Sequence, residues 1–357
     1  MRFVNLCCGI ALAAVMPAVL AGQTGGPGQL VASASKTPVL GKKKVVKPAG
    51  PPAKELFSAV KTPTVLAAHA IGFYAKGCLA GAKALPVDGD AWQAMRLSRN
   101  RNWGHPNLIA LIEKLAVDAR AHDGWPGLLV GDISQPRGGP MPSSHASHQV
   151  GLDADIWFTP MPNERLSSEQ REDLAATSML ADDKVSVDPK IWTDTHVRLL
   201  KRAASYPSVE RIFVHPAIKK ALCDAAAHDG DRAWLHKVRA YWGHNDHFHL
   251  RIACPAGSPS CEHQPPLPSD DGCGKELTRW LALVAPKPPA PKPTRPVPAR
   301  PPKPEITLDQ LPAECRVVLT RAPGGIAVPV ASKPTDPAPK AAKTVPPKSP
   351  QVGAATQ

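Results

Sequence analysis

The stretch SSHASHQVGLDADIW, residues 143–157, brings two histidines and a carboxylate close together: His145, His148 and Asp155. A second stretch, GHNDHFHLRI, residues 243–252, lies further along the chain. It contributes His244, His247 and His249. Imidazole and carboxylate are ligands that Zn²⁺ favours, and a catalytic zinc needs only three protein ligands plus a position for water. The two stretches therefore predict a catalytic zinc site.

Both stretches contain the alternation of polar and apolar residues that is typical of a β-strand. Residues 152–158 begin by alternating acidic and apolar side chains, and residues 247–252 alternate polar and apolar in the same way. Side chains two positions apart point to the same face of a strand. If the two strands are antiparallel neighbours, Asp155 and His249 can converge.

His148 precedes the first of these strands and lies on the loop that enters it. Gly151 allows that loop to turn back, because glycine has no Cβ to clash in a left-handed conformation. We therefore predict that His148, Asp155 and His249 bind the metal.

The general base is less obvious, because the chain lacks the H-E-x-x-H motif whose glutamate serves in other zinc peptidases. Asp246 is adjacent to the second motif, but on a strand it would face away from His247 and His249. A histidine titrates near neutral pH and is suited to proton transfer. We therefore expect His247 to act as base or to stabilise the transition state, with His244 or His145 assisting.

Other side chains near the motifs have alternative interpretations. Asp153 shares a face with Asp155 and is expected to be a hydrogen-bond partner rather than a second metal ligand. Arg137, in the loop before the site, either holds a substrate carboxylate through its planar fork or stabilises a turn. The serines beside the histidines do not form a G-x-S-x-G motif, so a serine nucleophile is disfavoured.

The N-terminus has the features of an export signal. Residues 1–22 combine Arg2, an apolar run over residues 9–20 and small residues around Ala21. The run is too short to span a bilayer, so we expect secretion and no membrane span. Six cysteines remain beyond the signal, and an even number in an exported chain predicts three disulfides whose pairing the spacing leaves open. These are Cys78, Cys223, Cys254, Cys261, Cys273 and Cys315.

The formal net charge of +13 is concentrated in the flanks of the chain. Residues 23–54 carry six lysines and no acidic residue, and residues 286–357 carry eleven basic residues against four acidic ones. Residues 55–285 are nearly neutral, whereas a nucleic-acid-binding protein carries its positive surface on the folded domain. This distribution argues against nucleic acid and favours electrostatic contact of the flanks with an anionic polymer such as a cell wall. The alternative is that the lysines only keep the flanks solvated.

Composition divides the chain further. Residues 23–54 are a disordered linker rich in Lys, Pro and Gly; residues 286–304 are a proline-rich, semi-rigid strap; and residues 323–357 are a disordered basic tail. Residues 305–322 are apolar enough to dock onto the body. The remaining residues, 55–285, amount to one catalytic domain.

Periodicity and capping signals predict several elements within that domain. We expect helices over 106–121, 167–180, 194–205 and 216–227, and strands over 127–133 and 209–214 in addition to the two motif strands. Helices mixed with few strands indicate an α+β fold with a small, mainly antiparallel sheet flanked by helices.

The motif residues resemble a known family. His148-x-x-Gly151-x-x-x-Asp155, followed by His247-x-His249, resembles the pattern of the LAS zinc metallopeptidases. The match is closer to the penicillin-insensitive murein endopeptidases, over roughly Thr62–Cys315. Its motifs are GDISQPRGGPMPSSHASHQVGLDADIW, RIFVHPAIKKALC and WGHNDHFH.

This resemblance implies a LAS-like fold and one catalytic Zn²⁺ bound by His148, Asp155 and His249. It implies that Asp183, or the adjacent Asp182, is an active-site aspartate. Its further active-site positions are His145, His244 and His247. It also implies the disulfides Cys78–Cys315, Cys223–Cys273 and Cys254–Cys261.

The resemblance further implies a periplasmic endopeptidase that hydrolyses peptidoglycan cross-links between D-alanine and the side-chain amine of meso-diaminopimelate. Two alternatives remain. One is a D-Ala-D-Ala carboxypeptidase or dipeptidase on the same scaffold, although His244 stands where those enzymes usually have a glutamate. The other is a wall-binding protein that holds zinc without turnover.

Overall fold

The computed structural model describes residues 50–142, 145–288 and 304–322. The expected signal peptide, most of both expected linkers and the basic tail lie outside the described residues. The first described helix, α1 (Ala53–Ala59), begins two residues before the expected start of the catalytic body.

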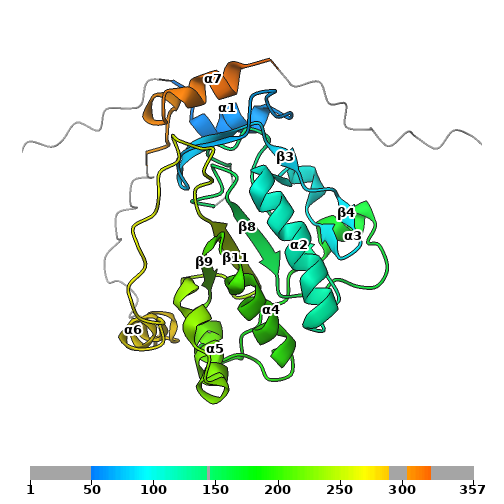
Figure 1. The fold of residues 1–357 in the computed structure, drawn as a ribbon, viewed down its shortest axis with the longest axis vertical. Coiled ribbons are helices and arrows are strands. Elements are labelled where there is room, and N and C mark those ends of the chain that lie inside the picture. Colours follow the sequence, from blue (N-terminus) through cyan, green and yellow to red (C-terminus); the bar gives the residue numbers. More distant parts are fainter. Residues whose placement is uncertain (1–49, 143–144, 289–303, 323–357) are drawn as a thin grey trace, which may run out of the picture. The chain divides into compact units, whose positions relative to one another are not determined.

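A seven-stranded sheet forms the centre of the domain (Figure 1). Its strand order is β10-β9-β11-β8-β7-β5-β4, in which β10–β9 and β5–β7 are parallel and the other neighbours are antiparallel. This arrangement confirms the predicted α+β fold with a mainly antiparallel sheet. The strands are β4 (Asp88–Gly89), β5 (Trp92–Ala94), β7 (Leu128–Val130), β8 (Asp153–Trp157), β9 (Val209–Val214), β10 (Val238–Ala240) and β11 (His247–Ile252).

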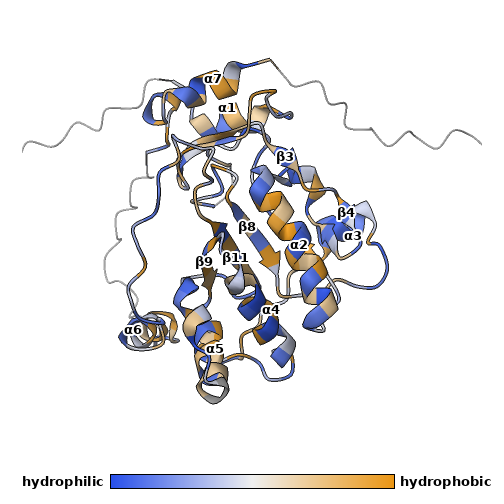
Figure 2. Cartoon of the chain, viewed as in Figure 1, coloured by the Kyte–Doolittle hydropathy of each residue, from blue (hydrophilic) through white to orange (hydrophobic). Residues whose placement is uncertain are grey.

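Three helices supply most of the apolar core on one side of this sheet: α2 (Pro106–His122), α4 (Asp194–Ser205) and α5 (Pro216–Asp229). Ala154 and Ile156 of β8 are fully buried in this core. Figure 2 shows hydrophobic and hydrophilic stripes on the helices, as expected for amphipathic helices that cover a sheet. Because β8 alternates, its acidic residues point to the opposite face.

Two of these helices begin in the same unusual way, with a histidine as N-cap followed by proline. Nδ1 of His105 accepts a hydrogen bond from the backbone N–H of Asn107 at 3.2 Å. Nδ1 of His215 accepts one from Ala217 at the same distance. Each cap satisfies one of the backbone donors that a helix start leaves unpaired, and it requires that Nδ1 carry no proton.

A second layer joins the two ends of the described chain. The hairpin β1 (His69–Phe73) and β2 (Lys76–Ala80) packs against α1 and against α7 (Glu314–Thr320) around a small apolar cluster. Phe57 of α1 is fully buried there. The backbone N–H of Ala53 donates to the carbonyl of Ile306, so residues 304–322 contact the start of the domain.

Three disulfides cross-link the domain, and they have the pairing that the family resemblance implied. The pairs are Cys78–Cys315, Cys223–Cys273 and Cys254–Cys261, with sequence separations of 237, 50 and 7 residues. The first attaches α7 to β2, and the second ties the start of α6 (Lys275–Val284) to α5.

The predicted elements differ in accuracy. Helices α2, α4 and α5 and strand β9 match within two residues, and β7 is shorter than expected. The predicted helix over 167–180 is wrong beyond Asp173: the capping box forms, but α3 (Ser168–Asp173) ends at Leu174 in extended backbone. Residues 174–180 instead contact the rim of the site, where Met179 donates to the carbonyl of Asn245. The remaining short elements are β3 (Lys83–Ala84), β6 (Trp103–Gly104), η1 (Leu97–Arg99), η2 (Ala233–Lys237) and η3 (Leu308–Gln310).

Candidate metal centre

Strands β8 and β11 are antiparallel neighbours, and their register brings the two histidine motifs together. His249 lies opposite Asp155, and Arg251 lies opposite Asp153. All four side chains are on the face of the sheet away from the main helices, as the alternation requires. The predicted convergence of Asp155 and His249 is confirmed.

The loop before β8 carries His148 into the same place. His148 has a left-handed backbone (φ 66°), which is uncommon for a residue with a Cβ. Its N–H donates to Asp153 Oδ2 at 3.0 Å, which holds the turn. Gly151 is also left-handed (φ 68°), and a Cβ there would lie 2.4 Å from the side chain of Leu79.

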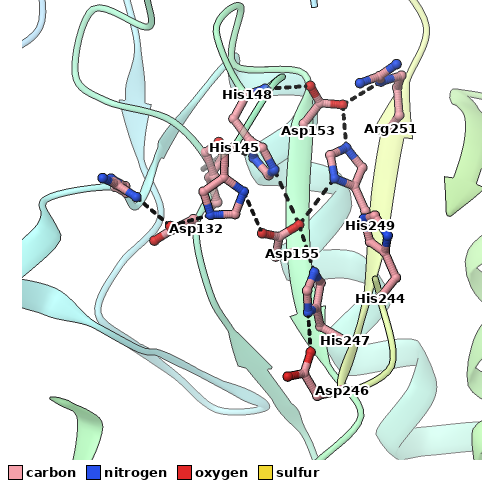
Figure 3. A network of polar contacts seen from close by, with 12 residues as sticks. Asp132, His145, His148, Asp153, Asp155, His244, Asp246, His247, His249 and Arg251 are labelled. Atoms are coloured by element: carbon pink, nitrogen blue, oxygen red, sulfur yellow. Dashed lines mark hydrogen bonds and ion pairs between the residues drawn. The ribbon is translucent and has the colours of Figure 1, made fainter. Parts of the chain in front are cut away.

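Hydrogen bonds fix which ring nitrogens carry protons. His148 Nδ1 lies 2.7 Å from the carbonyl of Ile133 and His249 Nε2 lies 2.9 Å from Asp153 Oδ1. Both oxygens only accept, so both nitrogens donate. The opposite nitrogens, His148 Nε2 and His249 Nδ1, each lie 3.3 Å from Asp155 Oδ1 (Figure 3).

This geometry fits a metal ion. Among the described residues, His148 Nε2 and Asp155 Oδ1 are buried without any hydrogen-bond partner. Two imidazole lone pairs facing one carboxylate oxygen repel each other unless a cation lies between them, and buried polar atoms are otherwise nearly always paired. Burial by itself would lower the pKa of His148, but the charges of Asp155 and Asp153 raise it to about 9. The site therefore favours positive charge at this point.

His145 supplies another potential ligand. It forms a group with His148 and Asp155 whose ligand atoms all lie within 4.8 Å of one another. His145 Nδ1 lies 3.6 Å from Asp155 Oδ2, whereas His249 Nδ1 lies 3.3 Å from Asp155 Oδ1. The side chain of His145 is 25 % exposed whereas that of His249 is 6 % exposed. His249 is the more buried and the closer of the two, so its assignment as the third ligand stays our prediction, whereas His145 lines the cleft.

A second layer of side chains holds these rings in place. Asp153 is fully buried and binds three groups: the N–H of His148, Nε2 of His249 and, at 2.5 Å, Nε of Arg251. Burial would raise the pKa of Asp153, but the charges of Arg251 and His249 hold it far below its usual range. A carboxylate behind a ligating histidine orients the ring and increases its basicity. Asp153 is thus a hydrogen-bond partner, as predicted.

Asp132 performs a similar role for His145 and was missed by the sequence analysis. Asp132 Oδ2 accepts from His145 Nε2 at 3.0 Å and pairs with Arg101 at 2.7 Å and Arg99 at 3.1 Å. Burial would raise the pKa of Asp132, but these partners lower it to about 2. The available signal was an aspartate at the end of the predicted strand 127–133, where it breaks an apolar run.

The expectation that Asp246 faces away from His247 is wrong. Asp246 precedes the first residue of β11, so strand alternation does not apply to it, and its Oδ1 accepts from His247 Nδ1 at 2.6 Å. In the neutral ring, Nε2 of His247 is then the nitrogen without a proton, and it lies 3.7 Å from Asp155 Oδ1. Burial would lower the pKa of His247, but Asp155 and Asp246 raise it above its usual value.

His244 is the other histidine of the second motif, and it lies among aromatic rings. Its ring centroid is 5.1 Å from that of His247 and 5.7 Å from that of His249. Nδ1 donates to the carbonyl of Trp242 at 3.0 Å. Burial and the neighbouring histidines lower the pKa of His244 to about 3, so this ring is neutral. Like His148, it has a left-handed backbone (φ 57°).

Two predicted residues lie elsewhere. Asp183 is in an exposed turn, where its carboxylate accepts hydrogen bonds from Val185 and Ser186. Within the described part of the chain it makes no contact with the histidines, and its role in the site stays a prediction that this geometry does not support.

The substrate interpretation of Arg137 is wrong. Arg137 is 2 % exposed, and its guanidinium donates to the carbonyls of Thr62, Val318, Leu319 and Arg321. It therefore caps the C-terminal end of α7 and has no access to substrate.

A cleft of about 350 Å³ opens beside the candidate metal ligands. Its lining includes His145, His247, Asp246 and Asp132, together with Arg96 and Arg99. Histidine and aspartate side chains that can exchange protons thus line a solvent-accessible cleft next to the candidate metal ligands. This arrangement is suited to hydrolysis.

Comparison with known proteins identifies the family. Residues 70–320 match the family described as penicillin-insensitive murein endopeptidase. Curated proteins of that name include one from Haemophilus influenzae, 47% identical over 62% of this chain and 75% of its own length. Another, from Pectobacterium atrosepticum, is 40% identical over 75% of this chain and 90% of its own length. A third, from Yersinia pseudotuberculosis, is 42% identical over 70% of this chain and 85% of its own length. The chain belongs to the penicillin-insensitive murein endopeptidase family.

Proposed function

We propose that this protein is a periplasmic zinc endopeptidase that hydrolyses D-alanyl-meso-diaminopimelyl cross-links of peptidoglycan. The observation that carries the metal assignment is the pair of buried, unpaired atoms His148 Nε2 and Asp155 Oδ1, 3.3 Å apart with His249 Nδ1 beside them. The names of the curated relatives support murein as substrate.

His148, Asp155 and His249 would hold the zinc. When bound, such an ion polarises a water and the scissile carbonyl and lowers the pKa of that water to about 7. Asp153 and the carbonyl of Ile133 keep the two rings in the tautomers that ligation requires.

His247 is the proposed general base. Its Nδ1 donates to Asp246, so in the neutral ring Nε2 holds the lone pair, 3.7 Å from Asp155 Oδ1, and His247 lines the cleft. Asp246 stabilises the imidazolium that forms when Nε2 accepts a proton, and the same ring then returns the proton to the leaving amine. His145 is held by Asp132 and lines the cleft, so its doubly protonated ring would be placed to stabilise the oxyanion.

Peptide cross-links lie within an extended polymer, so an endopeptidase needs an open groove rather than a closed pocket. Partial exposure of His145 and His247, at 25 % and 24 %, is consistent with such access. The basic flanking segments of the sequence would add electrostatic contact with the anionic wall.

The test is mass spectrometry of purified cross-linked muropeptide dimers incubated with the mature protein, with and without a zinc chelator. Monomers with intact tetrapeptide stems, lost on chelation and restored by zinc, are the expected result. Release of a single terminal D-alanine would instead identify a carboxypeptidase. Intact dimers, with the protein still sedimenting with cell walls, would leave only a binding role.

A further inference from the structure

A second cleft, of about 580 Å³, lies between the outer strands β9 and β10 and helix α6. Its lining includes Phe213, Tyr241, Trp280 and the guanidinium groups of Arg211 and Arg279. The wall formed by α6 is firmly attached, because the Cys223–Cys273 disulfide immediately precedes that helix and its residue Leu277 packs against β10.

Aromatic rings connect this cleft continuously to the metal centre. The ring centroid of Phe213 is 5.4 Å from that of His249 and 5.5 Å from that of Tyr241. Tyr241 is in turn 5.6 Å from Trp280. An extended peptide advances about 3.3–3.6 Å per residue, so an arm of roughly five residues reaches from the metal centre to Trp280.

The cleft carries an excess of positive charge. Of its three arginines, only Arg239 is neutralised, by the carboxylate of Glu276. Arg279 is exposed and has no polar partner in the described part of the chain. Arg211 donates to the carbonyl of Pro265, while its Nε is buried without a partner. The guanidinium of Arg279 is therefore available to an anionic group, and Arg211 adds positive charge to the lining. Carboxylate is the anion whose planar geometry a guanidinium matches.

Exposed apolar surface accompanies this charge. Tyr241 is 47 % exposed, Trp242 70 % and Leu283 63 %. Tyr241 and Trp242 belong to the segment that joins β10 to the catalytic strand β11, so the surface extends from the cleft toward the active site. Aromatic residues and arginine are the types most enriched where proteins bind their ligands and partners.

We propose that this cleft binds a carboxylate-bearing peptide arm of the cross-linked substrate. Arg279 contacts the free carboxylate, Arg211 contributes positive charge to the lining, and the Phe213–Tyr241–Trp280 wall supports the apolar side of the arm. The inference rests on the proposed function, because it takes the peptide attached to the scissile bond as the occupant. The chain's own segment 289–303 is a poor occupant, since it carries four basic residues and no acidic one.

The experiment compares KM and kcat of the zinc-loaded full-length enzyme on two muropeptide dimers, one with free stem carboxylates and one with those carboxylates amidated. Arg279→Gln should raise KM for the free-carboxylate dimer roughly three- to tenfold, with a smaller change in kcat. The increase should shrink with added salt and be absent for the amidated dimer. Lys275→Gln, an exposed charge on the same helix outside the cleft, is the matched control.

Equal KM values for wild type and Arg279→Gln, or an equal effect of Lys275→Gln, would overturn the proposal while leaving the peptidase function intact. If wild type cleaves neither dimer, the peptidase function fails. In that case, calorimetric titration of the same dimers into wild type and Arg279→Gln tests the cleft separately. The proposal still requires the variant to bind the free-carboxylate dimer more weakly than wild type does. Two further outcomes would overturn the proposal. If replacing residues 289–303 by Gly/Ser tightens dimer binding, that segment occupies the cleft. If the protein self-associates and Arg279→Glu abolishes this, a second copy of the chain occupies it.

Discussion

At the scale of the residue, His148 is fixed from three directions. Its N–H binds Asp153, its Nδ1 binds the carbonyl of Ile133, and its Nε2 faces Asp155. The left-handed backbone of His148 persists because these contacts over-determine it. A ring held in this way is pre-organised for a ligand, so its removal should affect the metal directly.

We therefore expect His148→Ala to lose bound zinc and peptidase activity together. Zinc content of the purified variant, measured by atomic absorption, checks this. Asp183→Asn is the control, because this exposed carboxylate bonds only within its own turn and the variant should retain both properties. Wild-type zinc content in His148→Ala would exclude this residue from the ligand set.

His247 differs, because it lines the cleft and its hydrogen bond is to Asp246 rather than to a residue behind the ligands. His247→Ala should retain zinc and lose about 10²–10⁴-fold in kcat, the usual contribution of a general base. Asp246→Asn should lower kcat less, since the ring remains. Parallel measurement of metal content and kcat checks both variants; a comparable loss of zinc in His247→Ala would instead make this histidine a ligand.

At the scale of the element, the histidine caps of α2 and α5 make helix formation depend on pH. Burial lowers the pKa of His215 to about 4 from its ordinary 6.5. Between these values the unfolded chain binds a proton that the folded chain does not, so stability falls as pH falls from 6.5 to 4. The full effect at one site is at most about 3 kcal/mol.

His215→Asn should reduce this acid sensitivity, because asparagine is a good N-cap that does not titrate. Urea unfolding at pH 7 and pH 4.5, with disulfides intact, measures the change. His263→Asn, on the exposed surface, is the matched control and should behave as wild type. If the free energy of unfolding of His215→Asn falls between pH 7 and pH 4.5 as much as that of wild type, the cap does not cause the acid sensitivity.

Helix α7 depends on one buried side chain. Arg137 donates to three carbonyls at the end of α7 or just beyond it, at 2.7–2.8 Å. Arg137→Met should lower the free energy of unfolding by about 3 kcal/mol, because buried carbonyls lose their charged donor. Arg316→Met, on the exposed side of α7, should change it little. Urea denaturation midpoints compare the two, and equal midpoints would contradict this account.

At the scale of the whole molecule, residues 304–322 are attached to the domain by contacts that do not involve the tail, residues 323–357. Cys78–Cys315 and Arg137 both hold residues before 323. Deletion of residues 323–357 should leave turnover of soluble muropeptides within about twofold of wild type, a change of less than 1 kcal/mol. It should weaken sedimentation with cell walls at low salt, since the tail is basic. A large loss of turnover on soluble substrate would place the tail in the reaction.

The sequence by itself determined much of the fold. Helices α2, α4 and α5 follow from apolar periodicity and capping signals, such as the proline in the first turn of α5, and the two motif strands follow from the alternation of polar and apolar residues. These signals are local, because each residue's preference is set by neighbours within one or two turns. The helix predicted over 167–180 failed beyond Asp173 for the opposite reason. Leu174 and Ala176 pack against an apolar cluster that includes Trp157 and Met161, and such long-range packing overrides the local preference.

For the site, the sequence pointed to five histidines and Asp155 that lie close together in the structure, because the residue types and their spacing are themselves the signal. Only the tertiary structure decided which neighbours complete them. Asp132 reaches His145, Asp246 turns toward His247, and Arg137 points away to α7. Phe213 and Trp280 form one wall with Tyr241 although they belong to separate elements. Such contacts depend on strand register and on where each strand begins, which are set by packing of the whole domain rather than by any short stretch of sequence.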